Sequence, residues 1–258
     1  MIFSWLRRRR RRRLLATPVP ADWLKWLARD YELWPRLDDD ERARLMAIAR
    51  VLVDEKSWEA AGGFVLDESA KVVIAAQAAL LLLGLGDTHD YYPNVESVVV
   101  YPAAYRLPGG GVDAAGVADS RPKAVLGTAH YRGPVVLSWR SARAGGRDAD
   151  DGRNLVYHEF AHKLDMLDGV VDGTPPLPDE RAYKTWFQVM TAHYDALVRA
   201  AEAGRKGFLD TYGATNVAEF FAVATEAFFE RSRWMRDRQP DLYGALQLFF
   251  RQDPARWR

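Results

Sequence analysis

The feature that most constrains the fold is a stretch at positions 154–170 with the sequence NLVYHEFAHKLDMLDGV. Large apolar side chains recur in it at helical spacing and predict one buried helical face. That face consists of Val156, Phe160, Leu164 and Leu167. Another face carries His158 and His162, whose rings stand one turn apart on the same side of the helix. Two imidazoles so placed can hold one metal ion between them.

Glu159 completes the pattern H-E-x-x-H, which is typical of zinc peptidases. Zinc lowers the pKa of a bound water to about 7, so a neighbouring carboxylate can take a proton from that water at neutral pH. The alternative is a solvated polar stripe on an ordinary amphipathic helix. We favour the metal site because the pattern falls on a helix with suitable faces. The chain has no cysteine, so any zinc ligands must be histidine, aspartate or glutamate.

A catalytic zinc needs a third protein ligand, and four carboxylates compete for this role. Asp165 shares the histidine face but lies about 7.5 Å along the helix axis from the midpoint of the histidines. We therefore expect Asp165 to form a hydrogen bond to His162 instead. Asp168 has the spacing of a third metzincin ligand, but the glycine that this arrangement requires is absent. Glu219 and Glu226 remain, and spacing alone does not choose between them.

The rest of the sequence predicts an α+β fold with a small sheet in mid-chain. Residues 95–105 are rich in valine and tyrosine and predict a strand, and residues 123–141 predict two short strands around a glycine-proline turn. Residues 142–154 are rich in glycine and aspartate and predict a loop. Helical patterns occur at 23–58, in 62–86 after an initial turn, at 183–204 and at 216–232, and residues 240–254 close the chain.

The start of the chain differs in charge from the remainder. Residues 1–20 contain seven consecutive arginines, Arg7–Arg13, and predict a basic, disordered tail. Without these arginines, 29 basic residues face 35 acidic ones, a net charge of −6. Such a surface argues against direct binding of nucleic acid. We expect a single domain over residues 21–258, with a helical N-terminal part over residues 21–90.

The apolar segments are short. The longest one, residues 72–85, falls below the length of about 20 residues that spans a bilayer, and the first residues do not match a secretory signal. The absence of cysteine mildly favours a reducing compartment. We therefore expect a cytoplasmic protein. A weak contact of residues 1–15 with an anionic membrane surface is the alternative to a plain tail.

Three segments together resemble a known family. NLVYHEFAHKLDMLDG, TYGATNVAEFFAVATEAFF and the strand VVVYPAAY are similar to segments of the MtfA (Mlc titration factor A) zinc metallopeptidases. The resemblance extends over about residues 30–255. It implies a zincin-like fold of the gluzincin type, with Zn²⁺ bound by His158, His162 and Glu219.

The resemblance also implies roles for the remaining site residues. Glu159 is then the general base, and Tyr212, seven residues before Glu219, assists catalysis. A phenol near the metal can donate a hydrogen bond to the oxyanion of a tetrahedral intermediate. Glu226, like Asp165, is then expected to support a metal ligand rather than to bind zinc.

The family resemblance implies a cytoplasmic, zinc-dependent peptidase with aminopeptidase-like activity on peptide substrates. Some family members bind the transcriptional repressor Mlc. The alternative function is therefore a regulator-binding protein that sequesters a repressor and whose zinc is structural or weakly catalytic. By analogy with zincins, residues 134–139 (PVVLSW) are expected to form the edge strand that pairs with the substrate. We expect His89, His130 and His193 to be structural or exposed.

Overall fold

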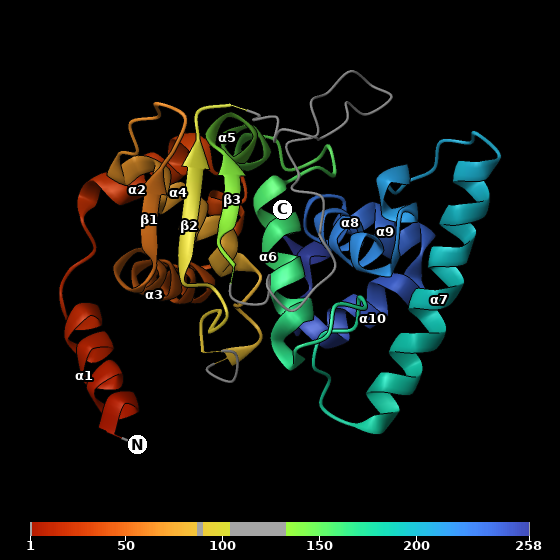
Figure 1. Cartoon of the computed structure of the whole chain (residues 1–258), viewed down its shortest axis with the longest axis horizontal. Coiled ribbons are helices and arrows are strands. Elements are labelled where there is room, and N and C mark those ends of the chain that lie inside the picture. Colours follow the sequence, from red (N-terminus) through yellow and green to blue (C-terminus); the bar gives the residue numbers. More distant parts are fainter. Residues whose placement is uncertain (1, 87–89, 104–132, 258) are drawn as a thin grey trace.

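The structure is a computed structural model that describes residues 2–86, 90–103 and 133–257. A small sheet lies near α2 to α5, and α6 lies between this part and the C-terminal helices α7 to α10 (Figure 1). The helices are α1 Ile2–Ala16, α2 Ala21–Asp30, α3 Asp39–Glu55, α4 Glu68–Leu80, α5 Trp139–Arg147, α6 Leu155–Asp165, α7 Glu180–Glu202, α8 Val217–Glu230, α9 Ser232–Arg238 and α10 Pro240–Phe250. The strands are β1 Ser57–Ala60, β2 Ser97–Tyr101 and β3 Val135–Ser138. Short 3-10 turns are η1 Trp34–Arg36, η4 Met166–Asp168, η5 Thr211–Ala214 and η6 Pro254–Arg256.

The sheet is parallel throughout its described part, with the strand order β1-β2-β3. Val98 of β2 is in register with Trp58 of β1 and with Val135 of β3. Helix α4 lies between β1 and β2 in the chain and supplies the crossover that parallel neighbours need. The small mid-chain sheet agrees with the expected α+β class. We did not expect β1, because its residues lack the β-branched composition of a strand and pairing with β2 decides their conformation.

Helix α4 forms the centre of the core. Apart from Lys71, every residue from Ala70 to Leu80 is buried, and α2, α3, α5 and α6 pack around it. A helix that is apolar on all sides has to be enclosed by other elements. Within the described ranges, no helix is both long and apolar enough to cross a membrane. The buried polar exception is Gln77, which donates to the carbonyl of Ala142 in α5 at 3.1 Å.

Residues 2–16 form helix α1, which corrects our expectation of a disordered tail. Arginine is a good helix former, and distant carboxylates hold the helix in place. Nε of Arg11 donates to Glu55 of α3 at 2.6 Å, and NH1 of the same residue donates to Asp90 at 2.8 Å. These partners lie 44 and 79 residues further along the chain, so the local charge pattern does not reveal them.

Helix α5 covers residues 142–147 of the segment 142–154 that we expected to be a loop, and the remainder of that segment is not helical. Its glycines are required for close packing rather than for a turn. A Cβ on Gly146 would lie 2.6 Å from the carbonyl oxygen of Asp30, and a Cβ on Gly145 would lie 3.0 Å from the Cα of Asn154. Two adjacent glycines therefore let α5 pack directly against the C-terminal end of α2 and the residue before α6. The glycine content predicted a loop because the sequence does not reveal this packing.

Replacement of Gly146 by alanine tests the close approach. The matched control is Gly244 in α10, which is exposed and where a Cβ would meet nothing within 4 Å. We expect Gly146→Ala to lower the free energy of unfolding by about 1–3 kcal/mol through overpacking. Gly244→Ala should raise it by up to about 1 kcal/mol, because alanine favours a helix. Urea unfolding measures both changes, and stabilisation by both substitutions would contradict the packing described above.

Candidate metal centre

Helix α6 is held at both ends by capping interactions. The side chain of Asn154 accepts hydrogen bonds from two backbone N–H groups of the first turn, as N-cap asparagines do. Nδ2 of the same side chain donates to Gln77 of the core helix α4 at 3.0 Å. At the other end, η4 follows and Gly169 closes it at a φ of 93°, a conformation that favours glycine. The helix is therefore shorter than expected, but it contains both histidines.

His158, His162 and Glu219 converge between α6 and α8. The Nε2 atoms of the two histidines are 3.2 Å apart. Oε2 of Glu219 lies 3.0 Å from Nε2 of His158 and 3.4 Å from Nε2 of His162. His158 and Glu219 are buried, and the side chain of His162 is 13% exposed. The structure thus brings together three predicted ligand atoms, and the two helices that carry them are far apart in sequence. We call these three residues the metal triangle.

The metal triangle has the size that a zinc ion requires. Zinc bonds of about 2.0–2.1 Å at tetrahedral angles separate neighbouring ligand atoms by roughly 3.3 Å. The three observed separations lie between 3.0 and 3.4 Å. Two imidazole nitrogens and one carboxylate oxygen are also a donor set that zinc accepts, and a tetrahedral ion bound by three residues keeps one position open for water. These residues could therefore hold a metal ion.

Glu226 lies behind His158 rather than in the metal triangle. Its Oε1 lies 2.7 Å from Nδ1 of His158, and its Oε2 accepts the backbone N–H of Asn154 at 2.7 Å. When Nδ1 donates its proton to Glu226, the lone pair of Nε2 points toward the carboxylate of Glu219. Two acceptors at this distance repel each other unless a cation lies between them. The contact with Glu226 therefore orients His158 for metal binding.

The titration of these groups reflects the same charge balance. Burial opposes a charge on His158, but the carboxylates of Glu226 and Glu219 outweigh burial and raise the pKa of His158 to about 10. Burial also acts to raise the pKa of Glu219, yet hydrogen bonds with His158 and His162 hold it well below its ordinary value. Two buried carboxylates create a negative potential that a positive charge must neutralise. A proton can do this, and so can a metal ion.

Capping interactions also orient Glu219 and Tyr212. Asn216 caps α8 by accepting the backbone N–H of Glu219 at 2.9 Å, while the Glu219 side chain turns toward the histidines. Asp210 caps η5 by accepting the backbone N–H of Tyr212 at 2.9 Å. The half-buried ring of Tyr212 has its centre 6.0 Å from that of His158. Tyr212 therefore lies beside the metal triangle.

Glu159 is half-buried on α6, next to the first histidine. Burial lowers the pKa of Lys163, and the charge of Glu159 opposes this shift. The same charge contributes to the raised pKa of His158. The carboxylate of Glu159 therefore lies close to the metal triangle and remains partly accessible, as a general base requires.

Asp165 and Asp168 lie outside the metal triangle. Asp168 is exposed and accepts the backbone N–H of Val170 at 2.9 Å. Asp165 is completely buried, and no side chain among the described residues donates a hydrogen bond to either of its oxygens. The expected bond to His162 is thus missing. Burial raises the pKa of Asp165 to about 6, against the opposing effects of the Gly173 backbone and of His162. Asp165 therefore lies close enough to His162 for the charge of the histidine to act on the carboxyl group.

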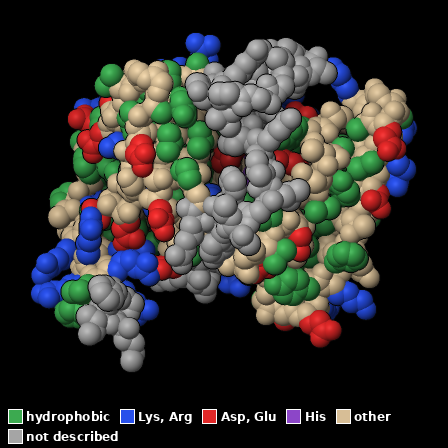
Figure 2. All heavy atoms as spheres, viewed as in Figure 1, with side chains coloured by type: hydrophobic (Ala, Val, Ile, Leu, Met, Phe, Trp, Pro, Cys, Tyr) green, Lys and Arg blue, Asp and Glu red, His purple; other side chains and the backbone are tan. Residues whose placement is uncertain are grey.

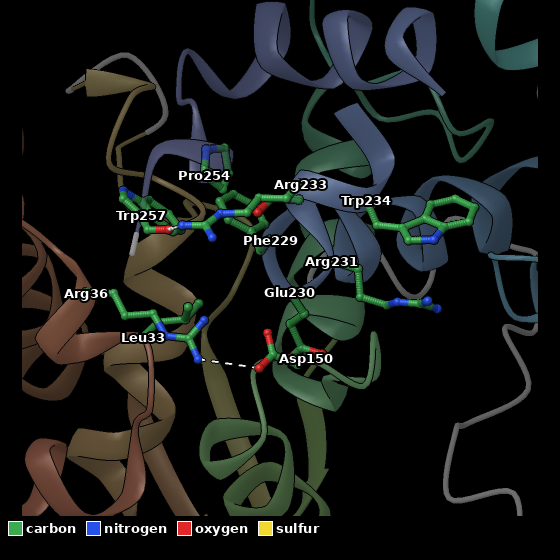
Figure 3. A pocket seen from close by; sticks show the side chains of 11 residues that line it. Leu33, Arg36, Asp150, Phe229, Glu230, Arg231, Arg233, Trp234, Pro254 and Trp257 are labelled. Atoms are coloured by element: carbon green, nitrogen blue, oxygen red, sulfur yellow. Dashed lines mark hydrogen bonds and ion pairs between the residues drawn. The ribbon is translucent and has the colours of Figure 1, made fainter. Parts of the chain in front are cut away.

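A cavity of about 590 Å³ opens at the C-terminal end of α8 and is lined by none of the metal-triangle residues (Figure 3). Glu230, one turn after Glu226, is buried there, and burial raises its pKa well above the ordinary value, with the charges of Glu226 and Asp151 acting in the same direction. Arg36 and Asp150 face each other across the cavity at 3.6 Å. The segments that line it are remote in sequence, so no motif predicts it.

The metal content of variants distinguishes Glu219 from Glu226. We expect Glu219→Ala to be purified without bound metal, because one of the three candidate ligands is lost. Glu226→Ala should retain metal but bind it about 10–100-fold more weakly, as happens when the support of a histidine ligand is removed. Mass spectrometry and chelator competition measure the two effects, with exposed Glu202→Ala as a control. Loss of metal from the Glu226 variant alone would contradict the assignment of Glu219 as the third candidate ligand.

Comparisons with known proteins extend these findings. Residues 5–251 match the family described as "Glucose-regulated metallo-peptidase M90". An uncharacterized protein of Synechocystis, slr2042, is 31% identical over 246 residues, which covers 95% of this chain and 89% of the relative. Mlc titration factor A of Edwardsiella ictaluri is 34% identical over 223 residues, which covers 84% of this chain and 83% of the relative. The protein of the same name from Serratia proteamaculans is 32% identical over 239 residues, covering 91% and 88%.

These matches confirm the resemblance that the sequence motifs predicted. They extend over most of the chain and include both helices that carry the metal triangle. A candidate metal site made of two histidines and a glutamate is also what a metallopeptidase requires. The chain therefore belongs to the glucose-regulated metallopeptidase family M90.

Proposed function

We propose that the chain is a zinc-dependent peptidase of the gluzincin type, with His158, His162 and Glu219 as metal ligands. The observation that carries this proposal is the metal triangle, whose three ligand atoms lie 3.0–3.4 Å from one another beside a general-base candidate. The two ligands from one helix and the third from a later helix agree with the gluzincin arrangement. We also propose that residues 21–258 form one catalytic domain, because elements from α2 to η6 share a single hydrophobic core.

The chemistry follows from the positions of the side chains. Zinc, when bound, supplies a Lewis acid that polarises the scissile carbonyl and acidifies a water. Glu159 accepts the proton of the attacking water and later delivers it to the leaving amine. The hydroxyl of Tyr212 donates a hydrogen bond to the oxyanion that forms when water adds to the carbonyl. Glu226 keeps the His158 ring in place, and Asp165 contributes negative charge near His162.

The substrate is proposed to be a peptide held along β3. This strand is hydrogen-bonded to β2 on one side, and among the described residues no strand pairs with its other edge. It also packs against α6, which carries the histidines. An extended peptide can add to such an edge through backbone hydrogen bonds. The family resemblance supports an aminopeptidase-like preference and a cytoplasmic location.

Substitution of Glu159 tests the reaction. We expect Glu159→Gln to abolish most hydrolysis of amino-acyl p-nitroanilides, with kcat lower by about 10²–10⁴-fold, because the amide cannot accept a proton. Its zinc content should equal that of the wild type. Exposed Glu202→Gln is a matched control that should keep full activity. Activity that survives in the Glu159 variant but disappears with a chelator would rule out this base.

Tyr212→Phe separates the oxyanion role from packing. The substitution keeps the ring and removes only the hydroxyl. We expect kcat to fall by about 10²–10³-fold with little change in KM, since the hydrogen bond forms mainly in the transition state. An unchanged kcat would assign Tyr212 a packing role.

A second function, the capture of a transcriptional repressor, is supported by the names of relatives called Mlc titration factor A. In this alternative, zinc is structural or weakly catalytic and the partner is a repressor protein rather than nucleic acid. Pull-down with purified Mlc repressor tests it on the wild type and on Glu159→Gln. We expect equal capture by both proteins if binding is the function. Absence of capture by the wild type would remove this alternative.

A further inference from the structure

Helix α1 divides its arginines between two faces. Arg7, Arg10 and Arg11 lie at helical spacing on one face and form ion pairs with the body of the protein, through Asp90, Asp54 and Glu55. Arg11 is the most enclosed of the three, with a side chain that is 15% exposed and stacks over the ring of Tyr91. This face therefore attaches α1 to the protein.

A second set of contacts fixes the C-terminal end of α1. The NH1 group of Arg50 in α3 donates to the carbonyl oxygen of Thr17 at 3.0 Å. Leu14, on the same side as Arg11, is half-buried, and α1 packs against α3. The helix is thus anchored along one side, and the ion pairs of that side fix its orientation on the body of the protein.

The opposite face of α1 carries unpaired charge. Arg8, Arg9, Arg12 and Arg13 are exposed, and none of them forms an ion pair with any residue in the described ranges. Figure 2 shows basic side chains gathered over the region where Figure 1 places α1. The chain without its seven consecutive arginines has a net charge of −6. The outward arginines therefore form a local positive surface on an otherwise acidic protein.

Apolar side chains stand beside these arginines. Trp5 is 53% exposed and Leu6 is 48% exposed, and Arg9 lies over the Trp5 ring. Exposed tryptophan and leucine next to arginines favour a lipid bilayer over nucleic acid, because the headgroup boundary accommodates both aromatic rings and alkyl chains. A polyphosphate in water would attract the arginines but would not bury the exposed tryptophan and leucine side chains.

We propose that the outward face of α1, made of Trp5, Leu6, Arg8, Arg9, Arg12 and Arg13, binds the surface of an anionic phospholipid membrane. The arginines contact lipid phosphates, and Trp5 and Leu6 insert at the headgroup boundary. The acidic body is repelled by the same surface, so only this face approaches the bilayer. Residues of the metal triangle take no part in the contact.

Vesicle sedimentation with the full-length protein tests the proposal. We expect the wild type to sediment with vesicles of phosphatidylcholine and phosphatidylglycerol, to remain in solution with phosphatidylcholine alone, and to be released by salt. The variant in which Arg8, Arg9, Arg12 and Arg13 are all replaced by glutamine should bind about 600-fold more weakly, since each of the four arginines near an anionic bilayer contributes roughly fivefold. Its thermal unfolding should match the wild type, because the attached face is unchanged.

A charge-matched control replaces four basic residues that lie far from α1 in the sequence. Arg181, Arg199, Arg205 and Lys206 are exposed on or just after α7, and their replacement by glutamine gives the same net charge. This control should sediment like the wild type. Equal loss of binding in both variants would overturn the proposal, because the effect would then depend on net charge alone.

Two further measurements test the proposal even if the four-arginine variant is unstable. Trp5→Ala combined with Leu6→Ala should reduce sedimentation with the same anionic vesicles at low salt, where the wild type binds, although all arginines are retained. Binding of duplex DNA as strong as binding of anionic vesicles, lost in the same arginine variant, would overturn the membrane assignment and identify α1 as a general polyanion site.

Discussion

The metal centre depends on two hydrogen bonds made by the carboxylate of Glu226. One oxygen contacts Nδ1 of His158, and the other accepts the backbone N–H of Asn154. A single side chain of α8 thus holds both the start of α6 and the first histidine of the metal triangle. Because both contacts are buried, loss of Glu226 would leave polar groups without partners in the core.

The core explains why these contacts can form. Helices α6 and α8 pack against each other, and Ala161 and Ala222 on them are fully buried. Small side chains at such positions leave room for the histidines and carboxylates to meet. Asn154 connects the same site to Gln77 in α4, the most enclosed helix. The position of the metal triangle is therefore set by the centre of the fold rather than by flexible loops.

Charge is distributed unevenly over the protein, and each part is neutralised in a different way. In the site, buried carboxylates face two histidines and create a negative potential that favours binding of a cation. In α1, three arginines are neutralised by carboxylates of the body, while four others remain on the outer face. The first arrangement supports metal chemistry, and the second supports our proposal of a membrane-facing surface.

The sequence by itself determined the helix with His158 and His162, the general base candidate beside them, the mid-chain strands β2 and β3 and the α+β class. These features follow from local periodicity and residue chemistry, which act over a few residues. Spacing did not choose between Glu219 and Glu226, and it suggested an Asp165–His162 bond that is missing. The family resemblance implied Glu219, but only the tertiary structure decided the contacts: Oε2 of Glu219 lies 3.0–3.4 Å from Nε2 of both histidines, and Glu226 contacts Nδ1 of His158. These contacts depend on how α6 and α8 pack, which local spacing does not reveal. The helical state of α1 and α5 was also decided there, by ion pairs and glycine contacts with residues remote in the chain.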